Sequence, residues 1–419
     1  MMKKMAYLSV VTSLIGASAI SIDLGNFQLS IFRIIIILML FGLIVNLFKK
    51  NGIININRMK SNSYSIWFMC IWLTYAILTL AWAKDYISWG RAVYFLGLGV
   101  FCVIMYNKIF KSSDDILVTF RIISIMTVIH NVIGWYELTT GNYLFLAKEI
   151  AALYTHGNYP VSIFSNTNDF ATFMLISTFV NYICLANSRR LLMRIIHISL
   201  IISSIYLLIM TGSRANILGL FIAFAVFAYF SFQNRRGRII IFAFCAVAFT
   251  FLLFMPNVIN DFLLYINDAL YFKFSAQMGS DSIRINLIKN GLLFLINTFG
   301  FGTGAGNIEY WMSNYAVYST ENFVNIHNWW MEILVSYGVI IFILYLAFYV
   351  TLFRSQLKIY RYSKDKIESI IALGLMCCMV GFAIGGMSSS SNISSEWLWV
   401  FWGIAIAFQG MNNKILKER

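Results

Sequence analysis

Charged side chains are scarce in this sequence. Only 11% of its 419 residues are Asp, Glu, Lys or Arg, whereas soluble domains carry roughly 25%. Hydrophobic residues make up 60% of the chain. This composition excludes an ordinary soluble enzyme and predicts a polytopic membrane protein, because long apolar runs of this kind are typical of membrane-spanning helices.

Proline and cysteine are also rare. With two prolines and no low-complexity tract, nothing indicates an appended soluble domain, and we expect residues 1–419 to form a single integral membrane domain. The six cysteines fall in apolar runs without zinc-type spacing, so we interpret them as small core residues. There is no Walker loop, dinucleotide fingerprint, metal-ligand cluster or Ser-centred elbow. A paired-carboxylate site stays open, although no acidic pair in the loops has motif-like spacing.

Apolar runs of about 20 residues, enough to cross a bilayer, recur along the whole chain. The first run, after Lys3 and Lys4, also resembles a signal peptide with a cleavage site at Ala17-Ser18-Ala19. We favour a retained helix there, because a polytopic protein needs no cleaved signal. We therefore predict an all-α fold of about twelve transmembrane helices, near residues 5–22, 27–48, 64–83, 88–106, 116–136, 161–186, 191–210, 215–232, 238–255, 325–353, 367–387 and 395–411.

The net charge of +14 has two explanations, an anionic partner such as nucleic acid or basic cytoplasmic loops. If the predicted helices alternate in direction, most of the 31 Lys and Arg residues fall on the same side as the two termini. The acidic residues are more frequent on the other side. This bias argues against nucleic acid as a partner. It predicts a multi-pass protein of the cytoplasmic membrane with both termini in the cytoplasm.

The longest connection, residues 256–324, lies between the ninth and tenth predicted helices on the outer side. Loops of this length in compact proteins are usually functional. Within it, residues 282–296 are predicted to form a helix that Asp281 or Ser282 caps, with Arg284 on its packing face. A buried charge is costly unless it is paired. We therefore expect Arg284 to point into the protein or toward an anionic ligand.

Three short outer segments carry unusual residues. Gly300-Phe301-Gly302-Thr303-Gly304-Ala305-Gly306 permits tight turns and close backbone approach, so it is either a plain turn or a ligand contact. Arg214, after Ser213 in a short connection, either snorkels to the interface or acts in a site, the default for an ionisable residue at bilayer depth. Asn168 and Asp169 enter the sixth predicted helix, where helix capping explains one polar residue but less easily a cluster.

The stretch Asn325–Glu332 introduces the tenth predicted helix, and it contains one of only four histidines in the chain. His327 is predicted to lie on one stripe of this helix with Gly338. Asn328 and Glu332, at i and i+4, would share a neighbouring face. A lone histidine near a membrane interface is more often structural than catalytic, so the function of His327 depends on the residues around it.

Five outer motifs, taken together and in this order, resemble the O-antigen ligase and polysaccharide polymerase family. They are Asn166-Thr167-Asn168-Asp169-Phe170-Ala171, Gly212-Ser213-Arg214-Ala215, Asp281-Ser282-Ile283-Arg284, Gly300-Phe301-Gly302-Thr303-Gly304, and His327-Asn328 with Glu332 and Gly338. The motifs cover residues 160–345. The predicted topology extends the resemblance to the whole chain, since the family has about twelve membrane helices and a large external loop between the ninth and tenth. Thr167 is a departure, because the family often has proline there.

The resemblance implies glycosyl transfer outside the cytoplasmic membrane, without a nucleotide sugar, another cofactor or an obligatory metal. The donor would be a saccharide on polyprenyl diphosphate and the acceptor a saccharide hydroxyl. Membrane lipids, and a flippase and chain-length regulator of the same pathway, are the expected partners. Arg214 and Arg284 would bind the diphosphate, and His327 would act at the acceptor or the diphosphate. Arg91, on the outer side before the fourth predicted helix, is a third and weaker diphosphate candidate by its position. Four further residues would bind or orient substrate groups: Ser213, Asn168, Asn328 and Glu332.

The residue types suit these roles. Arginine offers a permanent positive charge and bidentate geometry for phosphate oxygens, which stabilises the charge that develops on a leaving diphosphate. Histidine, with an ordinary pKa near 6.5, suits removal of a hydroxyl proton.

We therefore predict a polymerase that transfers the growing chain to the next lipid-linked repeat unit, in a single displacement with inversion at the anomeric carbon. A ligase that moves finished chains onto lipid A core or protein shares the donor and the motifs. The polymerase is favoured because its activity does not presuppose an outer membrane. A transporter or flippase for the lipid-linked saccharide would need a polar path on both faces, whereas the notable residues cluster on the outer side.

Overall fold

The computed structural model describes residues 2–23, 28–49, 63–145, 158–164, 166–232, 280–389 and 392–418, together with residues 237 and 239. In these ranges the β-structure is one antiparallel pair, β1 (Ser21–Asp23) with β2 (Gln28–Ser30). The helices are α1 (Met2–Ser13), α2 (Gly16–Ala19), α3 (Ile31–Lys49), α4 (Ser63–Leu78), η2 (Thr79–Ala81), α5 (Tyr86–Ile109), α6 (Ser113–Thr140), α8 (Thr167–Ala186), α9 (Leu191–Met210), α10 (Arg214–Ser231), α13 (Ser280–Asn297), α14 (Ile308–Tyr315), α15 (Trp329–Tyr362), α16 (Lys366–Gly385), η3 (Asn392–Ser394), α17 (Glu396–Met411) and α18 (Asn413–Glu418).

Eight helical segments in the described ranges are long and apolar enough to cross a membrane. They are Tyr64–Ala81, Tyr86–Ile109, Ser113–Thr140, Thr167–Ala186, Leu191–Met210, Arg214–Ser231, Trp329–Tyr362 and Lys366–Gly385. Each overlaps a span predicted from the sequence, and the protein is thus an all-α polytopic membrane protein. Apart from residue 239, the predicted ninth span, residues 238–255, lies outside the described residues.

Two predicted spans near the chain ends differ from continuous membrane helices. The span 5–22 is broken, because α1 ends at Ser13 and Gly16 has a φ of 71°, a left-handed conformation that interrupts a right-handed helix. The span 395–411 corresponds to α17, which has 16 residues. Nearly all of its side chains are buried inside the protein, so α17 is surrounded by other helices rather than by lipid.

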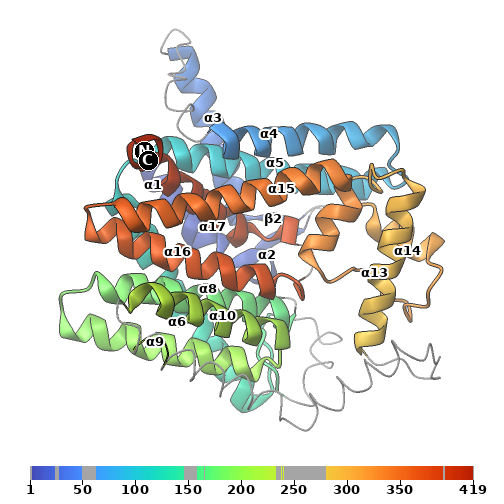
Figure 1. Ribbon diagram of the computed structural model, residues 1–419. Helices are drawn as coiled ribbons and strands as arrows, with labels where there is room; N and C mark the ends of the chain where they lie inside the picture. The colour runs from blue at the N-terminus through green and yellow to red at the C-terminus, as the bar shows by residue number, and fades with distance from the viewer. Residues whose placement is uncertain are drawn as a thin grey trace.

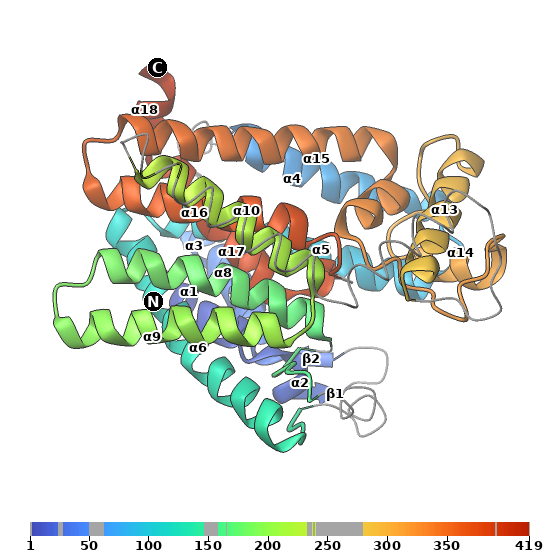
Figure 2. The same cartoon turned by 60° about the horizontal axis from the view of Figure 1, so that its bottom comes forward.

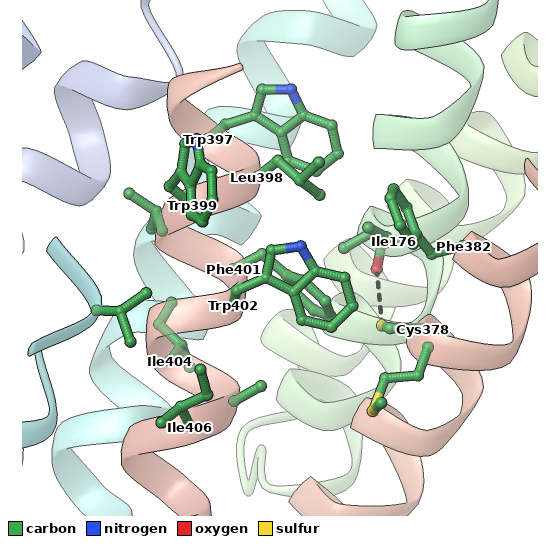
Figure 3. Packing of buried hydrophobic residues seen from close by; sticks show 14 of the residues in the cluster. Ile176, Cys378, Phe382, Trp397, Leu398, Trp399, Phe401, Trp402, Ile404 and Ile406 are labelled. Carbon is green, nitrogen blue, oxygen red and sulfur yellow. Dashed lines mark hydrogen bonds between the residues drawn. The ribbon is translucent and has the colours of Figure 1, made fainter. Parts of the chain in front are cut away.

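The hydrophobic core centres on α17, whose aromatic side chains contact several neighbouring helices. The centre of the Trp402 ring lies 5.6 Å from that of Tyr349 on α15. It lies 5.4 Å from the centre of the Phe382 ring on α16, and Figure 3 shows Trp402 and Phe382. Such edge-to-face pairs stabilise a core beyond the area they bury. Nearby, the Cys378 thiol approaches the Ile176 carbonyl at 3.7 Å. The five described cysteines are free and at least partly buried, as the sequence predicted.

The long helices run roughly side by side, and α13 and α14 stand together at one end of them (Figures 1 and 2). We call this end the loop end. The start of α1 and the short helix α18 lie at the opposite end (Figure 2). The loop end also gathers helix termini, since the N–H of Trp329 at the start of α15 donates to the carbonyl of Gly386 after α16. All of the candidate site residues lie in this part of the molecule.

Candidate functional site

A buried polar network fixes the turn at which α10 begins. The Ser213 hydroxyl donates to Asn168 Oδ1 at 2.7 Å, and Asn216 Nδ2 donates to Ser213 Oγ at 2.9 Å. Asn216 Nδ2 also approaches the Asn168 carbonyl at 3.2 Å, while its Oδ1 accepts from the Thr172 hydroxyl at 3.0 Å. Asn216 is fully buried, whereas Arg214 is exposed at the first position of α10. The network therefore fixes the backbone that carries the exposed Arg214 side chain.

Small residues let α10 and α16 approach closely enough to complete this network. A Cβ added at Gly385 would lie 2.2 Å from Asn216 Oδ1, and one added at Gly219 would lie 2.6 Å from the Gly381 carbonyl oxygen. Glycines at a membrane helix interface allow such close backbone approach, and polar side chains then bond across it. Asn216 is thus a hydrogen-bonding centre between α8, α10 and α16.

Arg284 lies near the start of α13, which confirms the helix predicted at 282–296. Leu287 of α13 packs with Val335 of α15 in a second, smaller hydrophobic core, separate from that around α17. Arg284 is half-buried beside this core. Asn290 of the same helix is fully buried, and its side chain binds backbone groups of the connection after α14.

His327 precedes α15 rather than lying on one of its stripes, so that prediction was wrong. Asn328 caps the helix, since its Oδ1 accepts hydrogen bonds from two backbone amides of the first turn, each at 3.1 Å, and α15 begins at Trp329. His327 has a φ of 45°, a left-handed conformation in which histidine is enriched. Its backbone N–H donates a hydrogen bond to Asn325 Oδ1 at 2.9 Å. The imidazole therefore belongs to the connection before the helix.

The structure brings Arg284 near His327. Burial lowers the pKa of the half-buried His327 imidazole below its ordinary value, and the positive charge of Arg284 lowers this pKa further. The imidazole is therefore neutral at neutral pH, with one nitrogen able to accept a hydrogen bond and the other able to donate one. Beside it, the guanidinium group supplies a permanent charge and planar donors suited to phosphate. We call Arg284 and His327 the arginine–histidine pair.

The glycine-rich segment 300–306 packs against a kink in α15. Gly338 has a φ of 78° and a ψ of 177°, a conformation essentially restricted to glycine. The Thr303 N–H donates to the Val335 carbonyl at 2.8 Å, which supplies a partner for a helix carbonyl near the kink. A Cβ at Gly302 would lie 2.6 Å from the Gly338 nitrogen. Close backbone approach within the protein thus explains these glycines.

A cavity of about 540 Å³ lies among the N-terminal segment, α5, α15 and the start of α17. Its volume falls in the range of ligand sites, roughly 300–1,000 Å³. The charged residues that line it are Arg33, Arg91, Asp169, Glu309, Glu332 and Glu396. The cavity adjoins the other site residues along the chain, because Asp169 follows Asn168 and Ile326, which also lines it, precedes His327.

Glu332 lines this cavity from the first turn of α15. Asp169 and Glu309 are near enough to interact with it electrostatically. Asn325 Nδ2 donates to Glu309 Oε1 at 3.2 Å. Carboxylates from α8, α14 and α15 therefore surround one space. Arg91 of α5, predicted as a third diphosphate contact, lines the same cavity.

A buried ion pair forms another part of the cavity wall. Arg33 Nε lies 2.7 Å from Glu396 Oε1, and the two residues are 5% and 8% exposed. The Ser30 hydroxyl donates to the same carboxylate oxygen at 2.7 Å, and the guanidinium carbon lies 4.7 Å from the centre of the Phe95 ring. Such partners compensate the cost of burying the charges. Among the described residues, Glu396 Oε2 has no hydrogen-bond partner.

The structure thus brings together Ser213 with Asn168 and Arg284 with His327, while Arg91 and Glu332 line the same cavity. Asn328 is a helix cap. Sequence reasoning missed Asn216, Arg33 and Glu396. A usable signal existed for Arg33 and Asn216, because each is a strongly polar residue inside an apolar run.

The fold and the loop-end site are those of a multi-pass membrane protein with cationic groups and a polar cavity near one end of its helices. Residues 198–346, which contain Arg214, Arg284 and His327, match the family model described as O-Antigen ligase. This match confirms the resemblance drawn from the sequence motifs.

The chain is also similar over nearly its whole length to the teichuronic acid biosynthesis protein TuaE of Bacillus subtilis (strain 168). The two are 29% identical over 407 residues, which cover 96% of this chain and 83% of the relative. Together, the family match and this relative indicate a glycosyltransferase-like role in polysaccharide biosynthesis.

Proposed function

We propose that the protein is a polysaccharide polymerase. It transfers a glycan from polyprenyl diphosphate to a hydroxyl of another lipid-linked repeat unit. The reaction takes place on the outer side of the cytoplasmic membrane, and both termini lie in the cytoplasm. The observation that carries this proposal is the arginine–histidine pair at the end of a bundle of membrane helices. A permanent cation beside a neutral imidazole suits a diphosphate held at the membrane surface.

In this mechanism, Arg214 and Arg284 bind the donor diphosphate, and their charge stabilises it as it leaves. The acceptor oxygen attacks the anomeric carbon as the bond between this carbon and the diphosphate oxygen breaks. The electron pair of that bond leaves with the diphosphate, and the configuration at carbon inverts. His327 acts on the diphosphate or on the acceptor hydroxyl. The prenyl chain lies among the helices, and the arginines supply the charge stabilisation without a metal ion.

A ligase that moves finished chains onto lipid A core or protein is the second candidate, because the matched family model carries the description O-Antigen ligase. The relative named for teichuronic acid biosynthesis supports a role in making a polymer. Glycans from a strain without the gene distinguish the two functions. Loss of a polymerase leaves single repeat units, whereas loss of a ligase leaves long chains on the prenyl lipid.

The diphosphate assignment is tested by R214A and R284A. Each should abolish long polysaccharide while the protein still inserts in the membrane, because each removes a charge from the leaving group. The matched control is R189A, an exposed arginine before α9 and outside the loop-end site. Normal chain lengths in both loop-end variants would end the proposal of a diphosphate clamp. Product formed by the purified protein would exclude pure transport, since no membrane has to be crossed.

A further inference from the structure

The cavity differs chemically from the arginine–histidine pair beside it. Of the charged residues that line it, Arg33 and Glu396 form an ion pair with each other. Of the other charged residues that line it, three are acidic, Asp169, Glu309 and Glu332, and one is basic, Arg91. A diphosphate carries negative charge and is disfavoured in such a space. Hydroxyl groups are favoured, because they donate charge-assisted hydrogen bonds to carboxylates.

Two further features of the cavity wall suit a saccharide. Phe95, Phe164 and Trp397 line it together with the carboxylates, and apolar and aromatic walls with a few polar groups are typical of small-molecule sites. Glu396 also lines it and is 8% exposed, and its Oε2 has no partner among the described residues. Because buried polar atoms are nearly always hydrogen-bonded, this oxygen calls for a donor that a hydroxylated ligand could supply.

We propose that this cavity binds the acceptor saccharide and that Glu332 removes the proton from its attacking hydroxyl. The proposal rests on the proposed glycosyl transfer. The hydroxyl proton passes to the Glu332 carboxylate as the acceptor oxygen bonds to the anomeric carbon. The bond from this carbon to the diphosphate breaks, and its electron pair leaves with the diphosphate at Arg284.

The chain segment around the start of α15 supplies both halves of this arrangement. His327 stands before Asn328, the helix cap, and beside Arg284, whereas Glu332 follows the cap and lines the cavity. A carboxylate that lines the acceptor cavity is better placed to receive the acceptor proton than an imidazole held beside a guanidinium group. His327 therefore acts on the diphosphate, as a hydrogen-bonding partner, and Glu332 is the catalytic base.

The test uses purified full-length protein and lipid-linked repeat units from cells that lack the gene. The acceptor is the same oligosaccharide released from its lipid, so that donor and acceptor can be varied separately. E332Q should slow transfer at least a hundredfold, since a positioned general base contributes about 10²–10⁴ in rate. E321Q is the matched control, because Glu321 is an exposed carboxylate in the connection after α14. It should transfer at the normal rate.

A second variant, E309Q, tests the cavity without disturbing the fold, because Glu309 is exposed. It should raise the KM for the oligosaccharide about tenfold, the effect of weakening one hydrogen bond to a charged group, and leave the KM for the lipid donor unchanged. Wild-type rates for E332Q, or an unchanged acceptor KM in E309Q, would overturn the acceptor assignment while R284A remains inactive. If the wild-type protein forms no product, or R284A is fully active, the proposed function itself fails.

Discussion

Arg284 and His327 stand beside the small hydrophobic core of α13, whereas Asp169, Glu309 and Glu332 line the neighbouring cavity. The first group combines a permanent cation with an imidazole, and the second consists of carboxyl groups. An enzyme that joins an anionic donor to a neutral hydroxyl gains from such a division, because each substrate is repelled or left unpaired at the site of the other. The charges of the two regions can therefore direct the donor and the acceptor to separate sites.

The turn before Arg214 and the cavity differ in how they are held. Side-chain hydrogen bonds around Asn216 support the turn before Arg214. The segment of α15 that carries Glu332 is held by backbone contacts between the glycine-rich segment and the kink at Gly338. Substitutions that remove polar side chains should therefore disturb the Arg214 turn most. Substitutions that add a side chain to a glycine should disturb the cavity.

The largest effect is expected for a reversed charge in the arginine–histidine pair. R284E would place a carboxylate where the diphosphate binds, so transfer should fall by more than about 10³-fold, beyond the 10²–10³ typical for loss of a single stabilising donor. R284K keeps the charge without the planar fork and should retain part of the activity. Initial rates of chain formation at matched protein levels measure both. Similar rates for the two variants would refute an electrostatic role.

The next effect concerns the kink that separates the Glu332 segment from the rest of α15. In G338A the new Cβ would lie 2.3 Å from the Gly300 carbonyl oxygen, so the variant should lose at least about 3 kcal/mol of stability. G90A is the matched control, because a Cβ at Gly90 in α5 meets no atom within 4 Å, and alanine is favoured over glycine in a helix. Thermal unfolding in detergent compares them. Equal stability of both variants would contradict the close packing of Gly338 against the glycine-rich segment.

A smaller effect is expected on the cationic side from N216A. The partners of the buried amide would lose their hydrogen bonds, which should lower the free energy of unfolding by about 1–3 kcal/mol. Arg214 would also be displaced, which should lower the rate of transfer about tenfold, or about 1.4 kcal/mol. N314A removes an exposed asparagine from α14 and should change neither stability nor rate. Unfolding and initial rates of both proteins test this. An N216A protein with normal transfer would show that Arg214 needs no such support.

The smallest effect is a pH dependence of the arginine–histidine pair. Burial and Arg284 lower the pKa of His327 in the folded protein, so its imidazole should stay neutral until the pH falls below the ordinary value of about 6.5. The unfolded chain binds the His327 proton more readily, so this group also makes stability fall as the pH drops through about 6.5. R284Q should raise the pKa of the His327 imidazole, since a charge that lowers it is removed, and NMR titration of labelled histidine measures this pKa. If the pKa of His327 is the same in R284Q and in the wild-type protein, Arg284 does not lie near the imidazole.

Much of the fold could be predicted from apolar runs, because a bilayer requires helices of nearly fixed length. The bounds were less predictable where tertiary contacts override the pattern. Residues 161–166 were assigned to a membrane helix, yet α8 begins at Thr167 with Asn166 as its cap. The kink at Gly338 depends on a distant glycine-rich segment, which hydrophobic periodicity does not report.

The candidate site was predictable in its residue types but not in its grouping. Arg214, Arg284 and His327 were identified because they are ionisable or rare near the membrane surface. The cavity with Asp169 and Glu332 was not foreseen, because its walls come from segments at both ends of the sequence. These segments meet only because helices that are far apart in the sequence pack together, and no spacing pattern in a single sequence reveals such contacts.

The division between the two regions is tested most directly by separate equilibrium binding of two ligands. One is a fluorescent polyprenyl diphosphate, and the other is the oligosaccharide released from the lipid. R284A should weaken diphosphate binding at least tenfold, an effect of about 1.4 kcal/mol, and leave oligosaccharide binding unchanged. E309Q should weaken oligosaccharide binding and leave diphosphate binding unchanged. If each variant weakens both ligands to the same extent, the donor and the acceptor do not occupy separate sites.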